Sequence, residues 1–170
     1  MDTPPELVRV YQATPQALAD VAAVMRECED YYRSVQGHPA DAKEAADFFR
    51  FAVPGIPAED VHAYAVYSGG RAVGLASLVL GWKRAGQSMV GLLVISGRDR
   101  GQGLGRATYE ALEATARASA HGTSMRIGIV ETNADAFPFW RALGFRENGE
   151  RKSLEEFVAE VVILEKDLGG

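Results

Sequence analysis

The chain has 170 residues, which suits one domain with a core large enough to fold without metals or disulfides. Its formal net charge of −5 and its scattered arginines argue against nucleic-acid binding, which depends on clustered Lys and Arg. With a single cysteine, no N-terminal apolar segment and no apolar run long enough to span a bilayer, we expect a cytoplasmic protein without a membrane partner.

The first sixty residues predict one strand and two helices. Residues 6–12 are rich in β-forming side chains, which favours a strand. Thr14 and Pro15 are typical of a helix start, and apolar residues at 3.6-residue spacing continue this helix toward Tyr32. A second helix is predicted over residues 41–51. We expect these two helices to cover a substrate site.

From residue 61 onward the apolar period changes from 3.6 to 2, which indicates strands. Residues 63–67 and 72–80 flank a Gly-Gly pair and predict a hairpin. The later predicted elements are a strand over 89–95, a helix over 104–120, a strand over 125–130, a helix from Asp135 to Leu143 ending at a left-handed Gly144, and strands over 145–151 and 157–166. The strand, helix and strand over 89–130 predict a right-handed βαβ unit with parallel strands.

The most informative segment joins the strand over 89–95 to the following helix. It reads Arg100-Gly101-Gln102-Gly103-Leu104-Gly105-Arg106. Closely spaced glycines let main-chain N–H groups converge on an anion, and the start of a helix adds unpaired donors and a positive dipole end. The segment therefore predicts a phosphate-binding loop.

Two common nucleotide motifs do not fit this loop. The chain contains no Gly followed five residues later by Gly-Lys-Ser or Gly-Lys-Thr, so it has no P-loop. A dinucleotide fingerprint that starts at Gly101 meets Arg106 where Gly or Ala is required, and one that starts at Gly103 meets Thr108.

The pattern that does fit is Arg/Gln-x-x-Gly-x-Gly/Ala, present as Arg100, Gly103 and Gly105. A second block follows, which reads Ile127-x-Ile129-x-x-x-Asn133-x-x-Ala136-x-x-Phe139-Trp140-x-x-x-Gly144-Phe145. With both blocks in this order, the chain resembles the GCN5-related N-acetyltransferase (GNAT) family over residues 60–165. The resemblance implies an α/β (α+β) fold with a mixed, twisted sheet of about seven strands, helices on both faces, and the order βααβββαβαββ.

The resemblance also implies a function. Acetyl-CoA would donate an acetyl group to a primary amine of a small molecule, peptide or protein by direct attack in a ternary complex, without a metal. One domain would span residues 1–170, with a strand and the substrate-covering helices in 1–60 and the cofactor-binding core in 61–165. The residues implied to bind the cofactor are Leu93, Val94, Ile95, Arg100, Gly101, Gln102, Gly103, Leu104, Gly105, Arg106, Asn133, Phe139 and Trp140.

Catalytic groups are less clearly marked. Glu131, just past the strand over 125–130, is the carboxylate that we place nearest the reacting centre, and the first helix offers further acids, Glu27, Glu29 and Asp30, that also fit a solvated helix end. Many family members protonate the leaving thiolate with a tyrosine at the position that is Trp140 here. Tyr32 is our candidate substitute together with its neighbour Tyr31, although both also fit helix packing.

Other interpretations stay open at this point. The missing tyrosine fits a non-catalytic acetyl-CoA-binding sensor or docking module, and the glycine loop alone also fits a tight strand-to-helix turn. An exposed terminal strand over 157–166 would allow pairing across a homodimer. The identity of the acceptor amine is not encoded in any motif of the first sixty residues.

Overall fold

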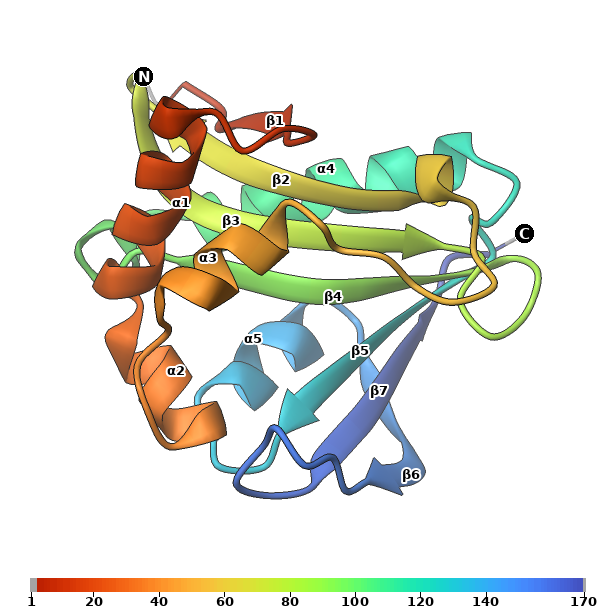
Figure 1. Ribbon diagram of the computed structural model, residues 1–170. Coiled ribbons are helices and arrows are strands. Elements are labelled where there is room, and N and C mark those ends of the chain that lie inside the picture. The colour runs from red at the N-terminus through yellow and green to blue at the C-terminus, as the bar shows by residue number, and fades with distance from the viewer. Residues whose placement is uncertain (1–2, 170) are drawn as a thin grey trace.

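The computed structural model describes residues 3–169 and contains a seven-stranded mixed sheet (Figure 1). The spatial order of the strands is β1-β2-β3-β4-β5-β7-β6. The strands are β1 (Glu6–Arg9), β2 (Val61–Ser68), β3 (Arg71–Leu80), β4 (Gln87–Ile95), β5 (Ser124–Val130), β6 (Arg146–Lys152) and β7 (Val161–Asp167). Only β4 and β5 pair in parallel among these strands, which confirms the predicted βαβ unit.

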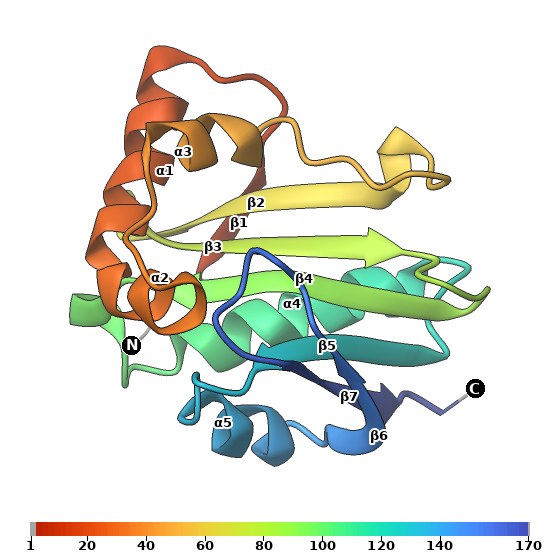
Figure 2. The same cartoon turned by 60° about the horizontal axis from the view of Figure 1, so that its bottom comes forward.

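Helices cover both faces of the sheet, as expected (Figure 2). The helices are α1 (Pro15–Glu27), α2 (Glu29–Gln36), α3 (Ala42–Phe48), α4 (Leu104–Ala118) and α5 (Ala136–Ala142). Helices α1, α2 and α3 pack on one face of the sheet, which we call the roof face. Val21, Val24 and Phe48 are buried there. Helices α4 and α5 pack on the opposite face of the sheet, where Leu112 and Trp140 are buried. The mixed α/β fold predicted from the sequence is confirmed.

The predicted first helix is divided in two. Cys28 ends α1 and begins α2, with a φ of −106° and a ψ of 24° that are not helical. The observed order of α-helices and strands is therefore βαααβββαβαββ rather than βααβββαβαββ. Short 3-10 turns precede β2 and α4, at Ala58–Asp60 and Gly97–Asp99.

The terminal strand does not lie at the edge of the sheet. β7 pairs with β5 on one side and with β6 on the other, so the expected pairing of this strand across a dimer is wrong. The strand also begins at Val161 rather than at residue 157, because residues 157–160 belong to the loop that approaches α2, where Val158 N donates to Val35 O at 3.0 Å. Similarly, β1 ends at Arg9 and α3 at Phe48, earlier than predicted.

A β-bulge in β4 opens the middle of the sheet. Ser77 of β3 pairs with Leu92 and its neighbour Leu78 pairs with Val90, so Gly91 has no partner. The parallel pairing of β4 with β5 runs from Gln87 only as far as Val90. Since a bulge bends its strand and increases the local twist, the two strands diverge beyond this point. This divergence creates the space for the site described next.

Candidate active site

The glycine loop lies where β4 ends and α4 begins. Gly101 and Gly103 have φ values of 78° and 81°, a conformation that favours glycine, and a Cβ built on either would meet no atom within 4 Å. Gly103 is the N-cap of α4, and the first helical hydrogen bond joins Ala107 N to Gly103 O at 3.1 Å. Within the described part of the chain, the N–H groups from Gly101 to Arg106 have no hydrogen-bond acceptor. The loop therefore offers converging donors to an anion.

Three polar contacts hold this loop and the 3-10 turn before it. Arg71 binds Asp99 through both guanidinium nitrogens, and this contact holds the pKa of Asp99 below its ordinary value. Ser96 donates a short hydrogen bond to Glu27 at the end of α1. Arg100 binds Asp30 of α2. The loop is therefore positioned by contacts with β3 and with helices α1 and α2 rather than by its own sequence alone.

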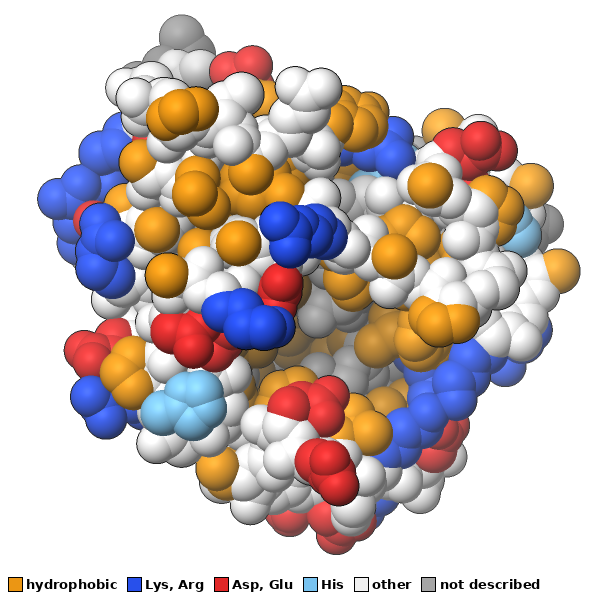
Figure 3. All heavy atoms as spheres, in the orientation of Figure 1, with side chains coloured by type: hydrophobic (Ala, Val, Ile, Leu, Met, Phe, Trp, Pro, Cys, Tyr) orange, Lys and Arg blue, Asp and Glu red, His pale blue; other side chains and the backbone are white. Residues whose placement is uncertain are grey.

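A cavity of about 920 Å³ fills the space between the diverging strands β4 and β5. Figure 3 shows the hollow in the middle of one face, with charged side chains of both signs around it. Its walls come from β4, the glycine loop, β5, the start of α5, α2 and the β6–β7 loop. The edge of β4 beyond Val90 lacks a strand partner on the β5 side among the described residues, so its main-chain polar groups face this cavity.

Aromatic side chains form the wall beneath the glycine loop. Trp140 is 8% exposed, and its ring makes edge-to-face contacts with Tyr109, Phe139 and Phe145 at centroid distances of 5.6, 5.0 and 5.2 Å. A Cβ added to Gly105 would lie 3.3 Å from Phe139. Gly105 therefore permits the close approach of α4 and α5, and Trp140 is a packing residue that borders the cavity.

Most of the residues that the sequence predicts at the cofactor site do border this cavity. They are Leu93, Val94, Ile95, Arg100, Gly101, Gly103, Leu104, Gly105, Arg106, Asn133, Phe139 and Trp140. Gln102, also predicted, does not line the cavity. Arg106 is exposed near the loop, with its guanidinium 3.6 Å from Glu110. These positions agree with the predicted grouping.

The candidate catalytic residues lie elsewhere. Glu131 does not line the cavity, and its carboxylate lies 3.3 Å from Arg151. Tyr32 is buried with α1 and α3 in the roof core and does not line the cavity either. Its neighbour Tyr31 does, and burial raises the pKa of the Tyr31 hydroxyl to about 12.

Other groups at the cavity were not singled out from the sequence. Ser34 of α2 donates to Thr132 O at 3.1 Å, and Thr132 donates back to Ser34 O at 2.6 Å, so α2 is tied to the β5–α5 connection. Leu154 and Phe157 reach the cavity from the β6–β7 loop. Cys28, between α1 and α2, does not line the cavity, and burial raises the pKa of its thiol to about 11, which fits an inert packing residue. No sequence pattern distinguishes these residues from ordinary surface or core positions.

None of the helices in residues 3–169 is long and apolar enough to cross a membrane. Within the same residues, no group of three or more His, Cys, Asp or Glu side chains is arranged to hold a metal ion.

Comparisons with known proteins agree with this architecture. The family model described as the acetyltransferase (GNAT) family matches residues 21–145. The crystal structure of an acetyltransferase from Thermus thermophilus superposes with a TM-score of 0.74 at 21% identity, covering 99% of this chain and 100% of that chain. No curated protein matches the chain by sequence.

Two further solved structures superpose over nearly the whole chain. The ribosomal-protein-S18-alanine N-acetyltransferase from Escherichia coli gives a TM-score of 0.67 at 14% identity, over 98% of this chain and 95% of that chain. Ard1 from Thermoplasma volcanium gives 0.68 at 15% identity, over 99% and 100%. At these identities, the likeness shows that the fold is shared.

Proposed function

The chain belongs to the GNAT family of acetyltransferases, and from this premise we propose that it transfers an acetyl group from acetyl-CoA to a primary amine. The observation that carries the proposal is the set of unpartnered N–H groups from Gly101 to Arg106 at one mouth of the cavity between β4 and β5. A pyrophosphate suits these donors because it is anionic and accepts several hydrogen bonds at once.

The rest of the donor would lie along β4. A pantetheine arm has two amides and pairs with a strand edge as another strand would. The β4 edge at Leu93, Val94 and Ile95 is open to the cavity and supports such pairing. The N–H of Leu93 or Ile95 would then polarise the thioester carbonyl as a single oxyanion donor, which contributes about 3 kcal/mol in other enzymes.

The acceptor would enter from the other side of the diverging strands. The glycine loop and the end of β4 border one part of the cavity, and Met89 near the start of β4, with Leu154 and Phe157 of the β6–β7 loop, borders another. We therefore divide the chain into a roof, residues 1–60, that selects the amine, and a core, residues 61–165, that holds the acyl donor. The two parts act together as one catalytic domain.

The reaction forms a C–N bond and breaks a C–S bond. The neutral amine attacks the thioester carbon, the tetrahedral intermediate collapses, and coenzyme A leaves as a thiolate. The proton lost by the amine balances the one that the thiolate gains, and water in the open cavity supplies the route. Because a thiol has a pKa near 8.5, this departure needs little acid assistance.

Tyr31 is the better placed of the two tyrosine candidates for the leaving thiolate, since it borders the cavity. With its pKa raised to about 12, its hydroxyl is a weaker acid than a thiol, so it would donate a hydrogen bond rather than a proton. Glu131 is poorly suited to act as the general base, because its carboxylate is exposed and paired with Arg151.

A coupled pair of measurements tests the proposal. Acetyl-CoA should raise the melting temperature of the protein, and a panel of amines should accelerate the release of free thiol from acetyl-CoA. The panel includes peptides that begin with alanine, because one similar structure is named as an N-acetyltransferase of a protein alanine. Thermal protection without amine-dependent thiol release would indicate the binding module instead, and the absence of protection would contradict both functions.

A further inference from the structure

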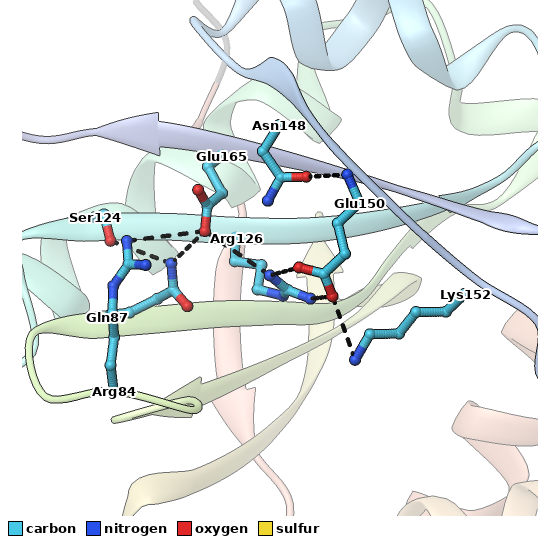
Figure 4. A network of polar contacts seen from close by, with 8 residues as sticks. All are labelled: Arg84, Gln87, Ser124, Arg126, Asn148, Glu150, Lys152 and Glu165. Carbon is cyan, nitrogen blue, oxygen red and sulfur yellow. Dashed lines mark hydrogen bonds and ion pairs between the residues drawn. The ribbon is translucent and has the colours of Figure 1, made fainter.

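A cluster of charged and polar side chains joins the start of β4 and the residues just before it to β5, β6 and β7 (Figure 4). The strand partner of Arg126 lies near the start of β4, so the cluster lies at the end of β4 that is far from the glycine loop. Arg126 of β5 donates to both carboxylate oxygens of Glu150 on β6, at 3.1 and 2.8 Å. Lys152 lies 3.5 Å from the same carboxylate. Glu165 of β7 accepts from Gln87 at 2.8 Å.

Register places this cluster beside the acceptor side of the cavity. Lys152 is the partner of Val161, and Arg126 is the partner of Met89. Val161 and Met89 both line the cavity. Since directly paired residues of neighbouring strands point to the same face, Lys152 extends over the surface that Val161 covers.

The cluster contains more positive than negative charge. Its charged members are Lys83, Arg84, Arg126 and Lys152 against Glu150 and Glu165, four cations and two carboxylates, which leaves an excess of two positive charges in a chain whose net charge is −5. Lys83 approaches Lys152, and this contact is the main reason that the pKa of Lys83 is lowered. Neighbouring ammonium groups repel. Glu150, 3.5 Å from Lys152, offsets part of this repulsion, and a bound anion would offset it further.

Two further observations point to a ligand. The Arg126 side chain is only 5% exposed, and its buried Nε has no hydrogen-bond acceptor among the described residues. Lys83 has a φ of 59°, unlike every other non-glycine residue in the described chain, and it lines a second hollow of about 440 Å³ with Arg84 and residues 53–56. Such strain persists where a specific position of the side chain matters.

We propose that the acceptor amine carries an oxyanion, a carboxylate or a phosphate, that is bound between Lys83 and Lys152. This inference rests on the proposed function, because it takes the reacting thioester to lie at Leu93. Met89 precedes Leu93 by four residues, about 13 Å along a strand. The lysine side chains reach along part of this span, so the amine and the oxyanion of the acceptor are separated by several bonds. An α-amino acid, in which one carbon lies between the two groups, would therefore be a poor acceptor.

The surface between the two ends of this acceptor is apolar. Met89, Val161, Leu154 and Phe157 line the cavity there. An acceptor with a hydrocarbon or other apolar segment between its amine and its oxyanion would bury that segment against these side chains. ε-Aminocaproate and ω-aminocaprylate have this character, and hexylamine and octylamine carry a methyl group in place of the carboxylate.

The test compares these matched amines. Binding to the protein saturated with coenzyme A is measured by calorimetry, and kcat/KM is measured with acetyl-CoA. The carboxylated amines should exceed the alkylamines by about tenfold or more, which corresponds to about 1.4 kcal/mol. Aminoalkyl phosphates of equal length show whether phosphate or carboxylate is preferred.

Variants assign the preference to the cluster. Lys83→Met and Lys152→Met should each remove most of it while leaving binding of the alkylamines unchanged. Lys43→Met is the matched control, because this exposed lysine pairs with Asp47 on α3. Equal binding of carboxylated and plain amines, including no binding of either, would overturn the inference. If coenzyme A still protects the protein and alkylamines still release thiol, the proposed function stands without it.

Discussion

The guanidinium of Arg100 donates to the carboxylate of Asp30, with 3.1 Å between Arg100 Nη2 and Asp30 Oδ1. This contact joins the glycine loop to helix α2, across seventy positions of sequence. The same arginine donates from Nε to the carbonyl of Ile95 at 2.8 Å. The residue that begins the phosphate-binding pattern therefore has two protein partners, and it fixes the shape of the loop relative to the roof.

Replacing Arg100 should weaken both folding and donor binding. In Arg100→Met, Asp30 and the Ile95 carbonyl lose their partner, and we expect a loss of stability of about 1 kcal/mol, because the pair is partly exposed. Arg106→Met is the control, since Arg106 is exposed and has only a long contact with Glu110. We expect Arg106→Met to weaken donor binding slightly and to leave the melting temperature unchanged. Calorimetry and thermal unfolding measure both effects, and equal melting temperatures for the two variants would contradict this role of Arg100.

The glycine loop gives a sharper prediction. Gly103→Glu should abolish coenzyme A binding, because it adds bulk and negative charge where an anion is expected. Gly105→Glu should abolish it as well, because its side chain would begin 3.3 Å from Phe139 and disturb the wall of the cavity. Gly103→Glu also carries a strain of about 1–2 kcal/mol at its positive φ. Gly70→Glu is a matched control: its φ of 77° brings similar strain, its Cβ would meet no atom within 4 Å, and it lies in the β2–β3 turn. If Gly103→Glu and Gly70→Glu bind coenzyme A equally well, the donor site is elsewhere.

Trp140 occupies the position at which many GNAT members have the acidic tyrosine, and the structure shows it packed against three aromatic rings. Trp140→Tyr and Trp140→Phe remove the same indole, so each should lose about 1–2 kcal/mol of stability. Only Trp140→Tyr adds a hydroxyl. We expect its kcat to exceed that of Trp140→Phe where departure of the thiolate limits turnover. Steady-state rates of the two variants are compared under conditions where both are equally folded. Equal kcat values would show that the added hydroxyl has no effect on turnover.

The architecture was largely predictable because it depends on local patterns. Alternating apolar residues marked β2 and β3, and Thr14 caps α1 by accepting from Ala17 N at 3.2 Å, as its residue type suggests. Gly144 does adopt a positive φ, of 103°, at the end of α5. These features are decided by neighbours within a few residues, so a single sequence contains the information.

The errors arose where distant residues decide the local structure. Nothing near Cys28 signals a break, since apolar spacing continues past it. The break fits the contacts that Glu27 and Asp30 make with Ser96 and Arg100, about seventy residues later. Within α2, Tyr31 lines the cavity and Tyr32 packs in the core, because adjacent residues of a helix point about 100° apart. Sequence spacing alone cannot separate two adjacent tyrosines in this way.

The two tyrosines can be separated by experiment. Tyr31→Phe should lower kcat several-fold with little change in the KM for acetyl-CoA, because only a hydrogen bond to the leaving thiolate is lost. Tyr32→Phe removes a hydroxyl from the buried roof core and should change stability rather than kcat. The comparison uses single-turnover rates together with melting temperatures. A larger loss of rate in Tyr32→Phe would restore the candidate that the sequence favoured.

His62 provides a pH-dependent test of the fold. The residue is 8% exposed, and its ring lies between the Glu59 carbonyl, 2.8 Å from Nε2, and the Tyr64 hydroxyl, 2.7 Å from Nδ1. A carbonyl only accepts, so Nε2 carries the proton, and Nδ1 accepts from Tyr64 in the neutral ring. Burial lowers the pKa of His62 below its ordinary value of 6.5.

The sign of the effect follows from this direction. Below about pH 6.5 the unfolded chain binds a proton at this histidine that the folded protein resists, so the unfolded state is favoured as the pH falls. The contribution of His62 is complete above pH 6.5 and is lost as the pH falls through its folded pKa. We expect His62→Gln to lower the melting temperature at pH 7.5 and to flatten its decline between about pH 7 and 5. His38 and His121 are unchanged in this variant, so they cancel in the comparison, and parallel pH profiles for the two proteins would show that His62 is not the group responsible.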